Sequence, residues 1–295
     1  MSAAGPVLRR EADWASLKTE LDGLLLTLDL DAHREDDPVS IVWSYPDPAD
    51  REVVALVAAA MAYGRVGLLK RAIRRALAPL GPSPARALRD LDDASIDAEG
   101  GLRSALDGFV YRMTRGEDVV ALYRAIGVAL RGHGSLLNLF LAGWDEGDED
   151  FQSGLGAFVH ALRAFGGSTE RGFFYLLSDP TTGSACKRLN LFLRWMVRGP
   201  DAVDTGLWSS LPSDRLVMPL DTHIVRICKY LGISSRNAQD WKLARQIAQS
   251  LKRLDPADPI KYDFALCHLG ISGACPSRRD PVCCRECPIQ SVCLL

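Results

Sequence analysis

Apolar residues recur every three or four positions over most of the chain, which is the period of an amphipathic helix. This pattern predicts helices at residues 13–30, 51–63, 66–80, 102–113, 119–130, 136–141, 151–165, 185–198, 222–231 and 241–254. Segments rich in glycine and proline, such as GPSP at 81–84, end several of them. No stretch alternates apolar and polar residues for long enough to predict a β-strand. The sequence therefore predicts an all-α protein, with short helices packed as an irregular bundle.

Polar positions at the ends and on the faces of these helices carry further predictions. Asp50 and Asp221 each precede an apolar helical segment, so each is predicted to be an N-cap. Helix 66–80 is predicted to bury Leu68 and to expose a run of basic residues, Lys70, Arg71, Arg74 and Arg75. The helix from 185 has a second polar face, formed by Lys187, Asn190, Arg194 and Arg198. A solvated surface is the commoner explanation of such faces, and phosphate binding is the alternative.

Composition narrows the class of protein. The chain has 295 residues, 47% of them hydrophobic and 24% charged, which is ordinary for a globular protein of one large or two modest domains. It has no run of about 18 apolar residues, so we expect a soluble protein with no membrane partner. The first residues, MSAAGPVLRREADW, lack the features of a secretory signal, which predicts a cytoplasmic location. The net charge of −2 gives no general attraction to nucleic acid, although a locally basic face can still bind it.

Eight cysteines are present, and five of them fall in the last 21 residues. Thiols stay reduced in the cytosol, so this cluster predicts a metal or iron–sulfur site in preference to disulfides. Four of the five can act together as ligands, namely Cys275, Cys284, Cys287 and Cys293, which leaves Cys283 over. Structural zinc sites usually have two C-x2-C pairs, and this segment has one. We therefore favour a [4Fe-4S] cluster, with zinc as the alternative. The remaining cysteines, Cys186, Cys228 and Cys267, lie in apolar helical patterns and are interpreted as small buried side chains.

A polar turn at 181–184 precedes the helix that contains Lys187. Backbone N–H groups at the start of a helix attract phosphate, and Gly183 and Ser184 would leave them accessible. The helix dipole disfavours a charged lysine at this end, which makes its amine a better nucleophile. Asp221 begins a later helix. Lys187 and Asp221 are thus the one candidate reactive pair in the sequence, against the simpler interpretation of a solvated lysine and a helix cap.

These features together resemble a known superfamily. The terminal cysteine pattern, the glycine-turn-lysine segment and the string LDTHIVRICKYLG are similar to the helix-hairpin-helix DNA glycosylases, in particular the endonuclease III branch with its C-terminal iron–sulfur loop. In that family a hairpin of pattern L-P-G-x-G-x-K precedes a V-D-T-H-x-x-R helix, and the present chain lacks the second glycine of the hairpin. The phrases GSACKRLNLFLRWMVR, PLDTH and DPIKYDFALCHLGI resemble more closely still DUF2400, a bacterial family of unknown function distantly related to those glycosylases.

The resemblance implies a two-lobed helix-hairpin-helix glycosylase-like architecture with a C-terminal metal-cluster loop. Residues 37–199 would form a central barrel-like domain that ends in the hairpin and its helix, and residues 1–36 plus 200–295 would form the second domain. Lys187 would attack C1′ of a flipped nucleotide, and Asp221 would activate it or stabilise the cationic sugar. DNA would lie between the two domains of a monomer, in contact with Gly183, Ser184, Arg194, Arg278, Arg279 and Arg285.

Three functions are compatible with these residues. The first is a DNA glycosylase that excises a damaged base, with or without AP-lyase activity, and it needs Lys187 and Asp221 in one cleft. The second is a non-catalytic protein that binds DNA structures and carries a structural [4Fe-4S] cluster, and it would tolerate loss of both residues. The third is a zinc-stabilised helical interaction protein with no nucleic-acid partner. Metal analysis separates the third function from the first two.

Overall fold

The structure is a computed structural model that describes residue 10 and residues 13–295. The all-α prediction is confirmed, because helices make up nearly all of the regular structure in this part of the chain. The N-terminal segment, from which we predicted the absence of a secretory signal, lies mostly outside the described residues. None of the described helices combines the length and the hydrophobicity that a membrane span requires.

The α-helices, in chain order, are α1 (Trp14–Thr27), α2 (Leu30–Asp36), α3 (Val39–Trp43), α4 (Pro48–Ala60), α5 (Val66–Leu77), α6 (Pro84–Arg89), α7 (Asp93–Asp97), α8 (Leu102–Ala105), α9 (Gly116–His133), α10 (Leu136–Leu141), α11 (Gln152–Gly166), α12 (Arg171–Leu176), α13 (Lys187–Val197), α14 (Thr222–Tyr230), α15 (Trp241–Leu251), α16 (Asp263–Ile271) and α17 (Pro281–Arg285). Short 3-10 helices are η2 (Ala78–Leu80), η3 (Pro180–Thr182), η4 (Ser213–Arg215) and η5 (Gln290–Val292). The strands are β1 (Val110–Tyr111) and β2 (Thr114–Arg115).

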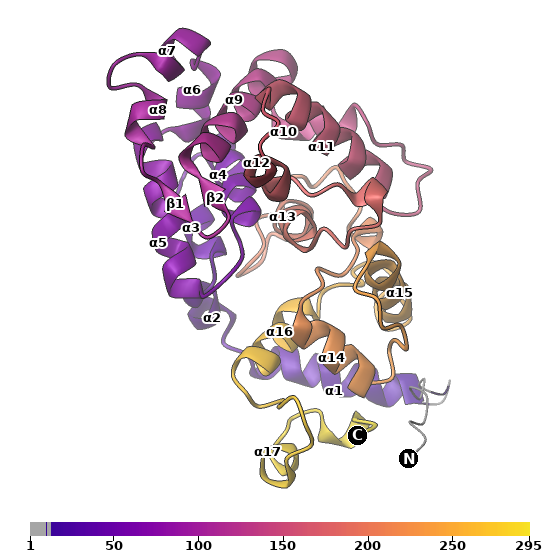
Figure 1. Ribbon diagram of the computed structural model, residues 1–295. Helices are drawn as coiled ribbons and strands as arrows, with labels where there is room; N and C mark the ends of the chain where they lie inside the picture. Colours follow the sequence, from indigo (N-terminus) through magenta and orange to yellow (C-terminus); the bar gives the residue numbers. More distant parts are fainter. Residues whose placement is uncertain (1–9, 11–12) are drawn as a thin grey trace.

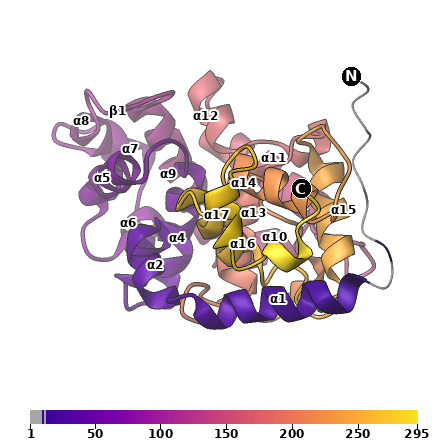
Figure 2. The ribbon, with the colours of Figure 1, turned by 90° about the horizontal axis from the view of Figure 1, so that it is seen from below.

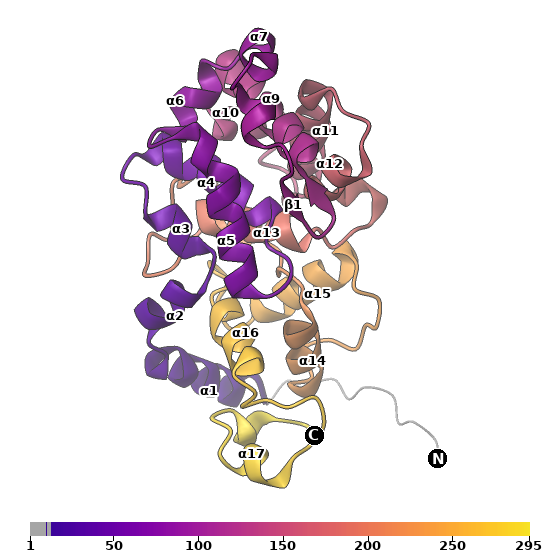
Figure 3. The same cartoon turned by 60° about the vertical axis from the view of Figure 1, so that its left-hand side comes forward.

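The helices form two groups (Figure 1). The larger runs from α3 to α13, and within it α9 packs on α11 and α4 packs on α13. The smaller contains α14 to α17, and α1 joins it from the other end of the chain (Figures 1 and 2). Tyr262 Oη, just before α16, donates a hydrogen bond to Asp22 of α1 at 2.7 Å. The C-terminal loop with α17 projects beyond the rest of this group (Figure 3). The division into domains 37–199 and 1–36 plus 200–295 stays a prediction.

An aromatic cluster fixes α13 and the loop that follows it within the larger group. Phe192 of α13 and Trp208 of the loop are both buried, with ring centroids 5.1 Å apart, and Phe158 of α11 stacks on Phe192 at 6.3 Å. Trp208 Nε1 donates to Glu52 of α4 at 2.8 Å, which satisfies the only polar atom of that side chain. The start of α13, where Lys187 lies, is therefore held by a packed core.

The prediction of one helix over 102–113 is wrong. Helix α8 already ends at Ala105, and a turn that contains Gly108, with a positive φ of 64°, leads into the antiparallel pair β1–β2. Glycine adopts this left-handed conformation without the steric cost that other residues meet, so the chain can turn at Gly108 instead of continuing the helix.

Two predictions about single side chains are also wrong. Asp47, not Asp50, caps α4, because Pro48 occupies the first helical position and the helix begins earlier than predicted. Asp50 is instead buried and accepts a hydrogen bond from Ala85 N at 2.7 Å. Leu68 is exposed, since the packed side of α5 is formed by Leu69, Ile73 and Leu77.

Candidate active site

The structure brings Lys187 and Asp221 together. Lys187 is the first residue of α13, and Asp221 is the N-cap of α14, where its Oδ1 accepts a hydrogen bond from Ile224 N at 2.7 Å. The other carboxylate oxygen, Oδ2, lies 3.6 Å from Lys187 Nζ. The Lys187 side chain is 42% exposed and that of Asp221 is 12% exposed. The predicted N-cap is confirmed, and the same carboxylate also faces an accessible amine.

A partly buried thiol completes the surroundings of Asp221. Cys267 of α16 donates its S–H to Asp221 Oδ2 at 3.2 Å. Burial raises the pKa of Cys267 well above its usual value, and the charges of Asp221 and Asp263 raise it further, so the thiol keeps its proton. The sequence identified Cys267 only as a small buried side chain. No spacing in the sequence links it to Asp221, because the two residues lie on different helices.

A second carboxylate, Asp37, belongs to the same region and was not predicted. It follows α2, and its Oδ1 accepts a hydrogen bond from Val39 N at 2.8 Å. Burial raises the pKa of Asp37 to about 6, against the positive charges of Arg194 and Lys187. Its side chain therefore changes charge not far below neutral pH, within the field of Lys187. In the sequence it lies in the polar segment DAHREDDP, where nothing distinguishes it from its neighbours.

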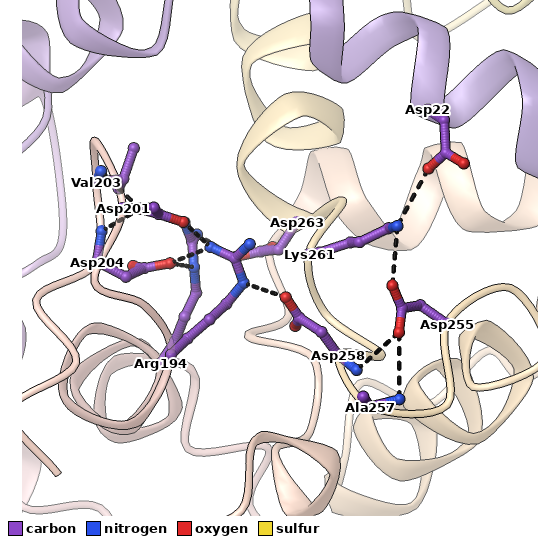
Figure 4. A network of polar contacts seen from close by, with 11 residues as sticks. Asp22, Arg194, Asp201, Val203, Asp204, Asp255, Ala257, Asp258, Lys261 and Asp263 are labelled. Carbon is purple, nitrogen blue, oxygen red and sulfur yellow. Dashed lines mark hydrogen bonds and ion pairs between the residues drawn. The ribbon is translucent and has the colours of Figure 1, made fainter. Parts of the chain in front are cut away.

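Arg194 faces the interior, so its predicted contact with DNA is corrected. Its side chain is 3% exposed, with Nη1 2.6 Å from Asp263 of α16 and Nε 3.2 Å from Asp204 (Figure 4). Arg198 reaches the same Asp204 at 2.7 Å. Asn190 and Arg194, in the middle of the polar face of α13, are buried. Buried charges persist only where they are paired. This network fixes α16, and with it Cys267, to α13.

The turn before α13 is exposed, as predicted. Gly183 has a φ of 85°, and a side chain added there would meet no neighbour. Gly183 N donates to Pro180 O at 3.1 Å and Cys186 N donates to Ser184 Oγ at 3.2 Å, so these two amides are already used within the turn. Trp241 N donates to Gly183 O at 3.1 Å, which ties the turn to the start of α15. Phosphate binding by Gly183 and Ser184 stays a prediction.

The four cysteines predicted as ligands line one cavity. Cys275, Cys284, Cys287 and Cys293 share a cavity of about 230 Å³ between α14 and the terminal loop, and Cys283 is not among its lining residues. In the described part of the chain, no three cysteine, histidine or acidic side chains are already close enough to hold a metal ion. Burial raises the pKa of Cys275 and of Cys287, and the charges of other cysteines add to this. Four thiols around one cavity fit a cluster or a metal in type and number.

The cysteine loop is attached to α14, the helix that Asp221 caps. Arg226 Nη2 of α14 donates to Cys275 O at 2.6 Å, and Tyr230 Oη donates to Ser277 O at 2.9 Å. The three arginines of the loop, Arg278, Arg279 and Arg285, are exposed, and none of them has an ion-pair partner among residues 13–295. The loop therefore presents unpaired positive charge close to the proposed ligands.

Comparison with known protein families assigns this chain to one of them. A family described as "Protein of unknown function (DUF2400)" matches residues 37–272. The chain belongs to the DUF2400 family. Lys187, Asp221 and Cys267 lie inside the part that DUF2400 covers, and the loop from Cys275 onwards lies beyond it. The predicted resemblance to DUF2400 is thus confirmed. No curated protein and no solved structure matches the chain.

Proposed function

We propose that this DUF2400 protein is a DNA repair glycosylase-like enzyme, which excises a damaged base from DNA through Lys187 and Asp221. The observation that carries the proposal is the 3.6 Å separation of Lys187 Nζ and Asp221 Oδ2 at the starts of two helices. An accessible amine beside a fixed carboxylate suits nucleophilic attack by lysine at a sugar carbon. The resemblance of the flanking sequence to helix-hairpin-helix glycosylases supports a nucleotide of DNA as the substrate.

In the proposed reaction the neutral amine of Lys187 attacks C1′ of the damaged nucleotide. The glycosidic C1′–N bond breaks, and its electron pair leaves with the base, which takes up a proton. Asp221 accepts the proton that the amine loses and stabilises positive charge on the sugar. Ring opening gives a Schiff base between Lys187 and C1′, from which β-elimination expels the 3′ phosphate. A glycosylase without this lyase step would use Asp221 to activate water as the nucleophile.

The C-terminal loop supports DNA binding in this proposal. Its exposed arginines, Arg278, Arg279 and Arg285, can pair with phosphates, as can the exposed turn at Gly183 and Ser184. A [4Fe-4S] cluster held by Cys275, Cys284, Cys287 and Cys293, or zinc in its place, would stabilise the fold of this loop. All the bond-making steps belong to the protein side chains named above.

Borohydride trapping on a duplex with one abasic site tests the proposal, with protein purified in the absence of air. We expect wild type to form a covalent adduct and Lys187→Gln to form none. Lys18→Gln is the matched control, because the side chain of Lys18 on α1 is 45% exposed and therefore about as accessible as that of Lys187. Asp221→Asn should lose base excision while DNA binding is retained. Trapping that persists in Lys187→Gln, or unchanged excision by Asp221→Asn, would contradict these roles.

A non-catalytic protein that binds DNA structures is the second candidate. The exposed arginines of the cysteine loop favour it, because they need no reactive pair in order to bind phosphate. This function predicts that wild type traps nothing on any lesion, whereas binding to the abasic duplex remains and is unaffected by Lys187→Gln. Absence of binding to any DNA would exclude both candidates.

A further inference from the structure

The carboxylate of Asp221 has a different environment at each oxygen. Oδ1 is committed to the first turn of α14, through the hydrogen bond from Ile224 N at 2.7 Å. Oδ2 has two neighbours, Lys187 Nζ at 3.6 Å and Cys267 Sγ at 3.2 Å. A tight lysine–carboxylate pair has an N–O distance of about 2.7–2.9 Å. The Lys187–Asp221 pair is therefore loose, and the thiol is the group that shares the oxygen with the amine.

Two contacts, one helical turn to either side, place Cys267 in this position. Asp263 is held by the buried guanidinium of Arg194 at 2.6 Å, which anchors the start of α16 to α13. Gly270 lies against the first turn of α14, where a Cβ would come within 2.5 Å of His223 Cβ, so only glycine allows the two helices to approach this closely. Cys267 lies between these two anchors. Its contact with Asp221 is thus imposed by the packing of α16 against both α13 and α14.

The hydrogen bond between Cys267 and Asp221 can run in only one direction. A carboxylate oxygen accepts hydrogen bonds, and a thiol that keeps its proton can only donate one to it. Each donor that binds Oδ2 reduces the attraction that this oxygen exerts on the Lys187 ammonium. We propose that Cys267 is a positioning residue, whose S–H holds Asp221 Oδ2 and weakens its ion pair with Lys187, so that the lysine amine is available for attack. The inference rests on the proposed function of Lys187 as the nucleophile.

The alternative is that Cys267 only fills space between α14 and α16. Under that alternative Cys267→Ala lowers stability and leaves Lys187 unchanged. Under the proposal Cys267→Ala removes the competing donor, the ion pair with Asp221 tightens, and Lys187 becomes less reactive. Cys267→Ser retains a donor at the same position and should behave as wild type. Asp221→Asn removes the charged partner, so Cys267→Ala should have no further effect on Lys187 in that background.

Competitive labelling measures the reactivity of Lys187 directly and needs no DNA. The full-length protein is treated briefly with an amine-acylating N-hydroxysuccinimide ester at neutral pH, and the acylation of Lys187 is quantified by peptide mass spectrometry with Lys18 as an internal reference. We expect labelling of Lys187 to be about threefold slower in Cys267→Ala than in wild type. Unchanged labelling in Cys267→Ala, an equal loss in Cys267→Ser, or an equal loss in the Asp221→Asn background would overturn the proposal. Thermal melting of each variant confirms that it is folded at the labelling temperature.

Borohydride trapping, run in parallel, tests the lyase function of Lys187 separately from the positioning role of Cys267. If wild type forms the adduct on the abasic duplex, Cys267→Ala should form it more slowly and Cys267→Ser at the wild-type rate. If wild type forms no adduct, the proposed lyase function fails, and the labelling result still decides whether Cys267 controls Lys187 through Asp221.

Discussion

Replacement of Arg194 by methionine should destabilise the fold and leave the exposed surface unchanged. The guanidinium is 3% exposed and lies between Asp263 at 2.6 Å and Asp204 at 3.2 Å. Methionine keeps much of the side-chain length and removes the charge. Asp263 then loses its ion-pair partner, and Asp204, which is fully buried, keeps only Arg198. An unpaired buried carboxylate is costly because the interior replaces its solvation poorly.

The size of the effect follows from this geometry. Removal of one partner from a buried ion pair costs about 3–5 kcal/mol. Two features place the cost of Arg194→Met near the lower end of this range. Arg198 still neutralises Asp204 at 2.7 Å. Burial also raises the pKa of Asp263 to about 6, despite the opposing charge of Arg194. Without that charge the carboxyl binds a proton near neutral pH. We therefore expect a loss of about 3 kcal/mol at about pH 8 and about 1–2 kcal/mol at about pH 5.5, where protonation limits the penalty.

Urea unfolding at these two pH values, followed by circular dichroism, measures the loss. Arg71→Met is the matched control, because Arg71 is exposed on α5 and its replacement should change stability by less than about 0.5 kcal/mol. Asp263→Asn added to Arg194→Met should recover part of the loss at the higher pH. A loss below about 1 kcal/mol, or one that does not depend on pH, would refute the buried network as the reason for this arginine. Folded Arg194→Met should bind DNA as wild type does.

Two further predictions concern Asp37 and the cysteine loop. The pKa of Asp37 is about 6 in the folded chain, against an ordinary value of 3.8. Between pH 3.8 and pH 6 the folded state therefore binds more protons than the unfolded state, and the free energy of unfolding falls as pH rises. Asp37→Asn should therefore raise the free energy of unfolding at neutral pH by up to about 3 kcal/mol and leave it unchanged below about pH 4, as a series of thermal melts would show. Cys284→Ser should remove most of the iron and the visible absorbance from anaerobically purified protein, whereas Cys283→Ser should remove neither. Stoichiometric zinc in a colourless wild type would contradict the iron–sulfur prediction, and equal iron loss in both variants would contradict the predicted ligand set.

Much of the fold could be predicted from the chain because apolar periodicity is a local signal. The helix that contains Phe192 and the helix that Asp221 caps both follow from residues within two turns of each other. The predictions for Asp50 and Arg194 failed because a polar side chain can be satisfied in two ways, at the surface or by a buried partner. Arg194 fits a solvated face and a buried ion pair equally well by sequence, and only the carboxylates of Asp204 and Asp263, supplied by distant segments, decide between them.

In the candidate site, α16 is the clearest case in which contacts with distant segments decide the role of a residue. Its sequence DFALCHLG carries Asp263, Cys267 and Gly270 on successive turns, and each contacts a different group: Arg194, Asp221 and His223. An acid, a thiol and a glycine inside an apolar helix do not form a recognisable local motif. Each has its own simpler explanation: the acid as a cap, the thiol as a small core residue, and the glycine as a break in the helix. Their shared role becomes visible only in the structure, where α16 packs against both α13 and α14. Helix α16, which brings Cys267 to Asp221, was therefore the part of the candidate site that sequence reasoning could not identify. The candidate pair, Lys187 and Asp221, could be named from the positions of the two residues at helix starts.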